Sequence, residues 1–251
     1  MSTTPHSPET ESSQDESHWA KPVSGLKVSD VPSGVNNLNV EGRQVVGPLQ
    51  GFGQLWQKTY RARFGSDVTP TEVVKVWKET LPDLMPAGSR FYPSMAGVQP
   101  GEILLINATM PGMPPGMTVS TGVMILYVDD VSFTVMTPEG HPESGFNTFS
   151  AYEDDDGETV AQIQSLARAN DPIFEFGFRF MGFSAHQEKI WQSVLTSLAS
   201  QFDLDPQVET NKVCVDSRVQ WSQAKNVWHN SVIRTTLNAP LRLGRRLFKR
   251  G

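Results

Sequence analysis

Hydrophobic and polar residues alternate along residues 55–64, LWQKTYRARF. Trp56, Tyr60 and Phe64 fall on one face of an extended chain, and Gln57 and other polar residues fall on the opposite face. A period of two, with aromatic residues on one side, is typical of a strand that is buried on one face only. We therefore expect a strand here.

The pattern changes from a strand to a helix over residues 69–82. Thr69 can cap the helix, Pro70 suits the first helical position, and Glu72 stands three residues after Thr69 as in a capping box. Apolar residues form one face, and Pro82 ends the segment. The sequence predicts a short amphipathic helix.

A series of strand candidates follows this helix. They are apolar or alternating segments, several of them rich in β-branched residues, at 101–109, 118–128, 131–137, 145–152 and 158–169. Asp129-Asp130 and Asp156-Gly157 separate neighbouring candidates, and Asp156-Gly157 is a strong hairpin signal because Asp and Gly tolerate positive φ. Short connections between successive strands favour an antiparallel meander.

Two patterns compete at the start of the last long segment, residues 170–202. Asp171 and Pro172 form a good helix start, whereas the phenylalanines that follow alternate strictly, as in a strand: Phe174, Phe176, Phe178 and Phe180. We favour a helix, because apolar residues beyond this point recur at helical spacing. Trp191 and Leu195 belong to that apolar face and are expected to be buried against the sheet.

The order of elements predicts an α+β fold, in which a curved antiparallel sheet wraps around a long helix. The expected organisation has four parts: a disordered N-terminal arm at 1–35, an extended lead-in at 36–54, the main domain at 55–205, and a helical C-terminal extension with a basic tail at 206–251. The arm is rich in Ser, Thr, Pro and Glu, which bury too little apolar surface to offset the entropy of ordering.

Residues 50–205 resemble the helix-grip superfamily, in the order of their elements and in the first helix, TPTEVVKVWKETLP. That group includes START lipid-transfer domains, Bet v 1-like plant proteins and polyketide cyclases. The segment GHPESG at 140–145 is also similar to the bacterial and plant domain-of-unknown-function family numbered 1990. The superfamily resemblance implies an apolar cavity between sheet and helix, and no fixed catalytic residue.

Length and cysteine content limit the class of protein. The chain has 251 residues, enough for one good core with extensions, and a single cysteine, Cys214, which rules out a disulfide within the chain. We find no run of 18 apolar residues and no basic region followed by an apolar run at the N-terminus. A cytoplasmic location is expected.

Charge is distributed unevenly along the chain. The net charge is −6, yet residues 217–251 carry eight basic and no acidic residues. An acidic body argues against nucleic-acid binding. The tail at 241–251 mixes leucines with five basic residues, so membrane-surface contact, a partner protein and a solvated tail all stay open.

Few residues suggest chemistry. The sequence contains no recognisable catalytic motif, and we expect no metal site and no cofactor. His141 and Glu143 are the best candidates in the strand region, since histidine suits acid–base work near neutral pH. The favoured interpretation of this segment is a polar turn shaped by its glycines and prolines.

The expected ligand contacts come from both walls of the predicted cavity: Phe149, Gln164, Arg168, Phe178 and Met181. Gln164 and Arg168 would orient a ligand among apolar side chains. In the alternative register, Ile163 and Ala167 face inward, and Gln164 and Arg168 face solvent.

The predicted function is non-covalent binding of an apolar or amphipathic small molecule, including a lipid. One alternative is a cyclase- or hydrolase-type enzyme in the same cavity. Another is an interaction module that acts through the C-terminal extension. Whether a reaction is catalysed stays open. An internal cavity with ionisable walls would favour the enzyme. A dry apolar cavity would favour the carrier, and a core filled by side chains would favour the interaction module.

Overall fold

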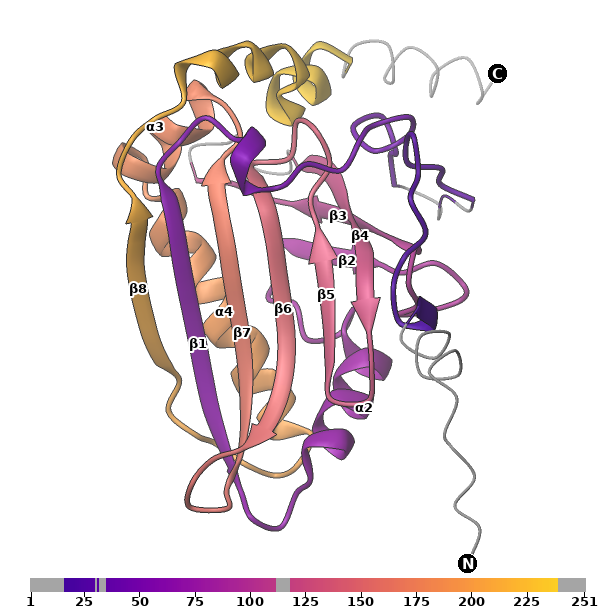
Figure 1. Ribbon diagram of the computed structural model, residues 1–251, viewed down its shortest axis with the longest axis vertical. Coiled ribbons are helices and arrows are strands. Elements are labelled where there is room, and N and C mark those ends of the chain that lie inside the picture. Colours follow the sequence, from indigo (N-terminus) through magenta and orange to yellow (C-terminus); the bar gives the residue numbers. More distant parts are fainter. Residues whose placement is uncertain (1–15, 30, 32–34, 112–117, 239–251) are drawn as a thin grey trace, which may run out of the picture.

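The computed structural model describes residues 16–29, 31, 35–111 and 118–238 (Figure 1). An eight-stranded antiparallel sheet curves around a long helix, which confirms the predicted α+β helix-grip class. The strand order is β2-β3-β4-β5-β6-β7-β1-β8. The strands are β1 (Leu55–Gly65), β2 (Ser89–Tyr92), β3 (Ile103–Ala108), β4 (Val119–Val128), β5 (Ser132–Met136), β6 (Glu143–Glu153), β7 (Thr159–Ala169) and β8 (Glu209–Asp216).

The helical elements lie before, within and after this sheet in sequence. They are η1 (Pro48–Gln50), α2 (Pro70–Thr80), α3 (Pro172–Phe180), α4 (Phe183–Ser200) and η2 (Trp221–His229). Helix α2 begins as the sequence predicts, since the Glu72 backbone N–H donates to the Thr69 hydroxyl and the Thr69 N–H donates to the Glu72 carboxylate.

The helix start at Asp171 prevails over the alternating phenylalanines. The Asp171 carboxylate accepts hydrogen bonds from the backbone N–H groups of Ile173, at 2.8 Å, and Phe174, at 3.0 Å. Gly182 then has a φ of +77° and separates α3 from α4. At Gly177 a Cβ would lie 2.4 Å from the Phe183 ring, so only glycine lets the two helices approach this closely.

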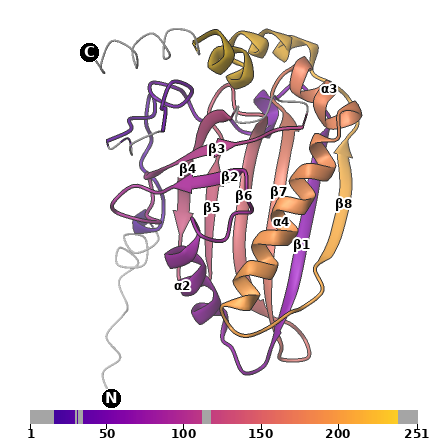
Figure 2. The ribbon, with the colours of Figure 1, turned by 180° about the vertical axis from the view of Figure 1, so that it is seen from behind.

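Helix α4 lies across the concave face of the sheet (Figure 2). Trp191 is 8% exposed and Leu195 is fully buried, which confirms the predicted face. They share one core with Tyr60 of β1, Trp77 of α2 and Ile163 of β7. The ring of Trp77 meets the rings of Phe133 and Phe149 edge-on.

A second, smaller core covers the other face of the sheet at β3 and β4. Its buried members are Leu26, Val40, Ile103, Leu105 and Met124. Residues 16–29 therefore pack against the sheet, which differs from the disordered arm expected over 1–35. The segment is poor in apolar residues, but the apolar back of β3 and β4 gives Leu26 a place to insert.

The structure also departs from expectation at β2. Strand β2 was not expected, and it pairs with β3 at one edge of the sheet. The extension adds β8 to the other edge, beside β1. The extension continues in the 3₁₀ helix η2 and then in a further helix at 231–238. The side-chain oxygen of Asn230 caps this last helix by accepting hydrogen bonds from the backbone N–H groups of Val232 and Ile233. Within the described ranges no helix is both long and apolar enough to cross a membrane.

Candidate ligand-binding cavity

A cavity of about 140 Å³ lies between the curved sheet and α4. Strands β2 to β6 form one wall, and α3 and α4 form the other. Most of the wall is apolar, including Phe91, Leu104, Val123, Val135, Phe149 and Ile190. The side chains of the sheet and of α4 therefore do not meet everywhere, and the core is not completely filled.

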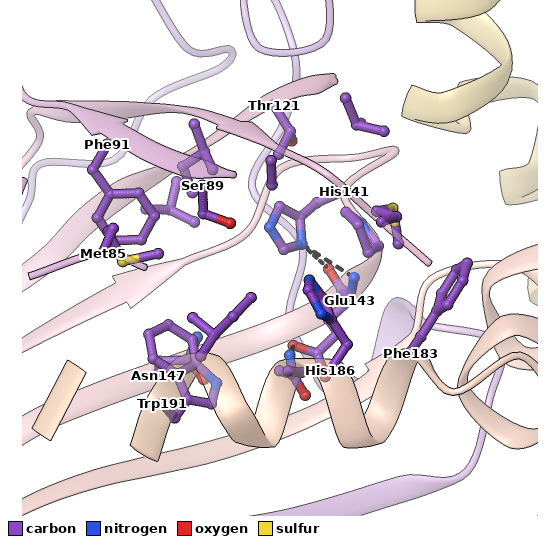
Figure 3. A pocket seen from close by; sticks show the side chains of 18 of the residues that line it. Met85, Ser89, Phe91, Thr121, His141, Glu143, Asn147, Phe183, His186 and Trp191 are labelled. Atoms are coloured by element: carbon purple, nitrogen blue, oxygen red, sulfur yellow. Dashed lines mark hydrogen bonds between the residues drawn. The ribbon is translucent and has the colours of Figure 1, made fainter. Parts of the chain in front are cut away.

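Polar side chains gather around one end of this cavity, where the turn before β6 faces α4 (Figure 3). The Glu143 carboxylate accepts a hydrogen bond of 2.6 Å from Gln187 Nε2. Gln187 Oε1 in turn accepts one of 2.7 Å from Lys58 Nζ. Lys58 is only 6% exposed, and its ammonium lies 5.5 Å from the centre of the Phe178 ring. The amide of Gln187 thus links two buried charges of opposite sign.

His141 borders the same end of the cavity and is half-buried. Its Nδ1 lies 3.1 Å from the backbone nitrogen and 3.0 Å from the carbonyl oxygen of Glu143. Burial lowers the pKa of His141 to about 4, while the contact with the Glu143 backbone acts in the opposite direction. The imidazole is therefore neutral at pH 7, and its Nε2 is the ring nitrogen left for a ligand.

Four buried polar atoms on the cavity wall have no hydrogen-bond partner in the part of the chain that the structure describes. They are Thr121 Oγ1, Asn147 Oδ1, His186 Nε2 and Trp191 Nε1. Leaving such an atom unpaired costs about 1–3 kcal/mol. Each of the four has almost no accessible surface, so these atoms lie behind the surface of the wall rather than facing the open space.

Two of the five residues predicted to contact the ligand line this cavity, Phe149 of β6 and Phe178 of α3. The other three do not. Met181 follows α3 and is 49% exposed. Gln164 and Arg168 lie on the sheet face opposite Ile163, because successive side chains of β7 alternate between the two faces.

The side chain of Arg168 faces neither the cavity nor water, and it holds neighbouring segments of the chain together. It is 3% exposed, and its guanidinium donates to Asp216 at 2.7 Å and to the carbonyl of Gly53 at 2.7 Å. It therefore fastens the segment before β1 and the end of β8 to β7. Ile163 points into the core and Ala167 lies on the same face, as in the alternative register.

Sequence reasoning assigned no ligand contact to several polar residues of the wall, among them Asn147 and His186. His186 stands four residues before Ile190, so helical spacing puts both on one face of α4. Asn147 and Phe146 are neighbours in β6, so their side chains lie on opposite faces of the strand. The alternation by itself does not say which of the two faces is buried. The segment GHPESG is both a turn and part of the wall, since His141 and Glu143 each border the cavity.

Comparison with known families matches residues 69–197, just over half of the chain, to the family described as Domain of unknown function (DUF1990). The resemblance seen in the segment GHPESG is confirmed by this match. No curated protein matches the chain.

Among solved structures, the KanY protein is 7% identical, covers 61% of this chain and 99% of its own, with a TM-score of 0.45. Ara h 8.0201 is 13% identical and covers 58% of this chain and 97% of its own, with a TM-score of 0.41. The di-domain ARO/CYC StfQ from the steffimycin biosynthetic pathway is 9% identical, and the match covers 59% of this chain and 50% of the StfQ chain, with a TM-score of 0.43.

Proposed function

The chain belongs to the family described as Domain of unknown function (DUF1990), and from that premise we propose that it binds a small, mostly apolar molecule non-covalently in the cavity between the sheet and α4. The observation that carries this proposal is the cavity itself, which is lined mostly by apolar side chains of the main core. Burial of apolar ligand surface supplies about 25 cal/mol per Å².

The volume limits the size of the ligand. A dry apolar cavity of roughly 150 Å³ holds a benzene-sized molecule, and the cavity here has about 140 Å³. A single ring, or the end of a longer chain, fits this space, whereas a whole phospholipid does not. The proposal is therefore narrower than lipid binding in general.

A substitution in α3 tests the proposal directly. Phe178→Asp places a carboxylate in the cavity wall and is expected to abolish binding of p-xylene, a one-ring apolar probe, in isothermal titration calorimetry. Phe176→Asp is the matched control, because Phe176 lies on the same helix and is 56% exposed. Equal binding by both variants, or no binding of any small apolar probe by the wild type, would contradict the proposal.

The natural ligand can be sought at the same time. Native mass spectrometry of protein purified from its host is expected to show a bound species of low mass, which denaturation releases. The Phe178→Asp variant, purified in the same way, is expected to lack it.

An acid–base enzyme is the second candidate, and the polar end of the cavity favours it. A simple carrier needs no ionisable wall, whereas His141, Glu143 and His186 all border this space. Incubation of the protein with small molecules from its host, followed by mass spectrometry, would show a new product with the wild type. The His186→Ala variant is the control for that experiment.

We also propose contact with an anionic membrane surface, at the end of the molecule formed by α3 and η2 (Figure 1). Trp221 and Trp228 of η2 are 75% and 80% exposed, and Phe180 of α3 is 69% exposed. Residues 217–238 contain three basic residues and no acidic ones. Exposed tryptophans with nearby basic groups are typical of interfacial segments. The predicted contact of the tail at 241–251 lies outside the described residues.

Vesicle co-sedimentation tests this contact. The full chain is expected to sediment with vesicles that contain phosphatidylserine and to remain in solution with phosphatidylcholine alone. Trp228→Ser should weaken the contact several-fold, and the effect should decrease with salt. Equal binding to both vesicle types by protein and variant would overturn the proposal, as would binding to neither.

The expected cytoplasmic location stays part of the proposal. Cys214 is a free, exposed thiol, and free thiols persist in reducing compartments. This supports such a location without identifying it.

A further inference from the structure

We infer that the ligand carries a carboxylate, which is bound by the ammonium of Lys58 in a second cavity beside the apolar one. This inference rests on the proposed function, because it assigns the polar end of the same ligand. The second cavity has a volume of about 210 Å³.

The second cavity lies between the concave face of the sheet and the junction of α3 and α4 (Figure 2). Its floor comes from the neighbouring strands β1 and β7, where Lys58 pairs with Ser165. Residues of α3, of the start of α4 and of β8 line the other sides: Glu175, Phe178, Arg179, Ser184 and Lys212. Charged side chains thus border this space, whereas the first cavity is mostly apolar.

The two cavities adjoin at Phe178 and Glu143, which line both of them. The Lys58 ammonium lies 5.5 Å from the centre of the Phe178 ring. It therefore stands beside the wall that the two cavities share. A ligand that extends past Phe178 from the apolar cavity brings its other end close to Lys58.

Lys58 is a buried cation without a carboxylate partner. Its side chain is 6% exposed. Within the described ranges its ammonium forms no ion pair and donates one hydrogen bond, of 2.7 Å, to Gln187 Oε1. An ammonium has three protons to donate. Because a buried charge is costly unless it is paired, this position favours an incoming anion.

The other basic residues of this cavity already have carboxylate partners. Arg179 pairs with Glu175 within α3, and Lys212 of β8 pairs with Glu188 of α4 at 2.9 Å. One cation is therefore left for a ligand, and it matches a single negative charge. A monocarboxylate fits this balance better than a phosphate monoester, whose second charge would be buried without a partner.

Glu143 opposes an anion in this cavity, but it acts from further away. The side-chain amide of Gln187 separates it from Lys58, since that amide accepts a hydrogen bond from Lys58 and donates one to Glu143. Coulomb energies fall with distance. A carboxylate that contacts Lys58 on the side away from Gln187 is therefore attracted more strongly by Lys58 than it is repelled by Glu143.

The test compares 4-phenylbutyrate with 4-phenylbutyramide, which share a ring and a linker and differ in the charge of the end group. In calorimetric titrations of the full chain at pH 7, we expect the acid to bind about tenfold more tightly or better, because hydrogen bonds between charged groups are stronger than those to a neutral acceptor. Equal affinities, tighter binding of the amide, or binding of p-xylene alone would overturn the inference and leave the proposed function standing. Binding of none of the three probes would instead contradict the proposed function.

Lys58→Met is the decisive variant, because methionine keeps an unbranched side chain and removes the charge. We expect the preference for the acid over the amide to disappear in it. Lys189→Met is the matched control, since Lys189 is exposed on α4 and lines neither cavity, and it should keep the wild-type preference. Lys58→Gln provides a second uncharged variant if Lys58→Met does not fold. A preference for the acid that survives loss of the Lys58 charge, or that Lys189→Met removes equally, would overturn the assignment to Lys58.

Discussion

Replacing Trp191 with alanine is expected to destabilise the protein by about 3–5 kcal/mol, as truncation of a buried tryptophan usually does. Trp191 is 8% exposed, belongs to the main core, and meets the Phe149 ring edge-on at 5.7 Å between centroids. Its indole N–H has no partner in the described chain. Removal of that N–H costs nothing, so the loss should lie near the lower end of the range. Urea unfolding of the ligand-free protein measures it.

Gln192→Ala is the matched control, one residue further along α4. Gln192 donates a hydrogen bond of 3.2 Å to the Thr210 hydroxyl at the exposed edge of the sheet. Substitutions at such positions usually change the stability by about 0.5 kcal/mol or less. Similar and small effects from both variants would show that α4 presents a different face to the sheet.

Lowering the pH from 7 to 4 is expected to destabilise the protein by up to about 3 kcal/mol through His141 alone. The pKa of His141 falls from 6.5 to about 4 on folding. The unfolded chain therefore takes up a proton at a higher pH than the folded chain. The stability that the neutral ring contributes is complete above pH 6.5 and is lost as the pH falls toward 4. Because the ring is half-buried, this figure is an upper limit.

The pH dependence of urea unfolding, measured between pH 4 and 7, tests this expectation. His141→Gln removes the titrating ring and should flatten the curve in that interval relative to wild type. His229→Gln is the control for histidine substitution in general, since His229 lies outside the cavity, in η2. An unchanged slope in His141→Gln would mean that the ring is solvated rather than enclosed.

Protonation of His141 also bears on ligand binding. A charged imidazole at the end of a mostly apolar cavity disfavours apolar probes, because the charge needs hydration that an apolar molecule cannot supply. Loss of p-xylene binding near pH 4 should therefore follow the same transition, provided the protein is still folded there.

Local signals in the sequence determined most of the elements. The capping box at Thr69 and Glu72 and the aspartate cap at Asp171 satisfy backbone N–H groups within a few residues, so their effect does not depend on distant parts of the chain. Helical spacing placed Trp191 and Leu195 on the buried face for the same reason. Asp171 also shows why the expected helix forms despite the alternating phenylalanines, since a local cap outweighs a period of two.

The sequence did not determine which face of β7 points toward α4. One face meets α4, and the other is partly covered by the segment around η1 and by the chain after β8. A strand that is covered on both faces loses the contrast between polar and apolar positions that reveals its orientation. Gln164 and Arg168 therefore suggested a cavity wall, although the tertiary structure puts them on the opposite face.

The cavity and its polar atoms were decided by tertiary structure alone. Thr121, Asn147 and Trp191 come from β4, β6 and α4, and they border one cavity only because the curved sheet and α4 leave space between them. The burial of Leu26 likewise depends on the apolar back of β3 and β4. The sequence by itself determined where most strands and helices form, because those signals act over a few residues. Which side chains converge, and what they leave unsatisfied, depends on packing between segments that are far apart along the chain.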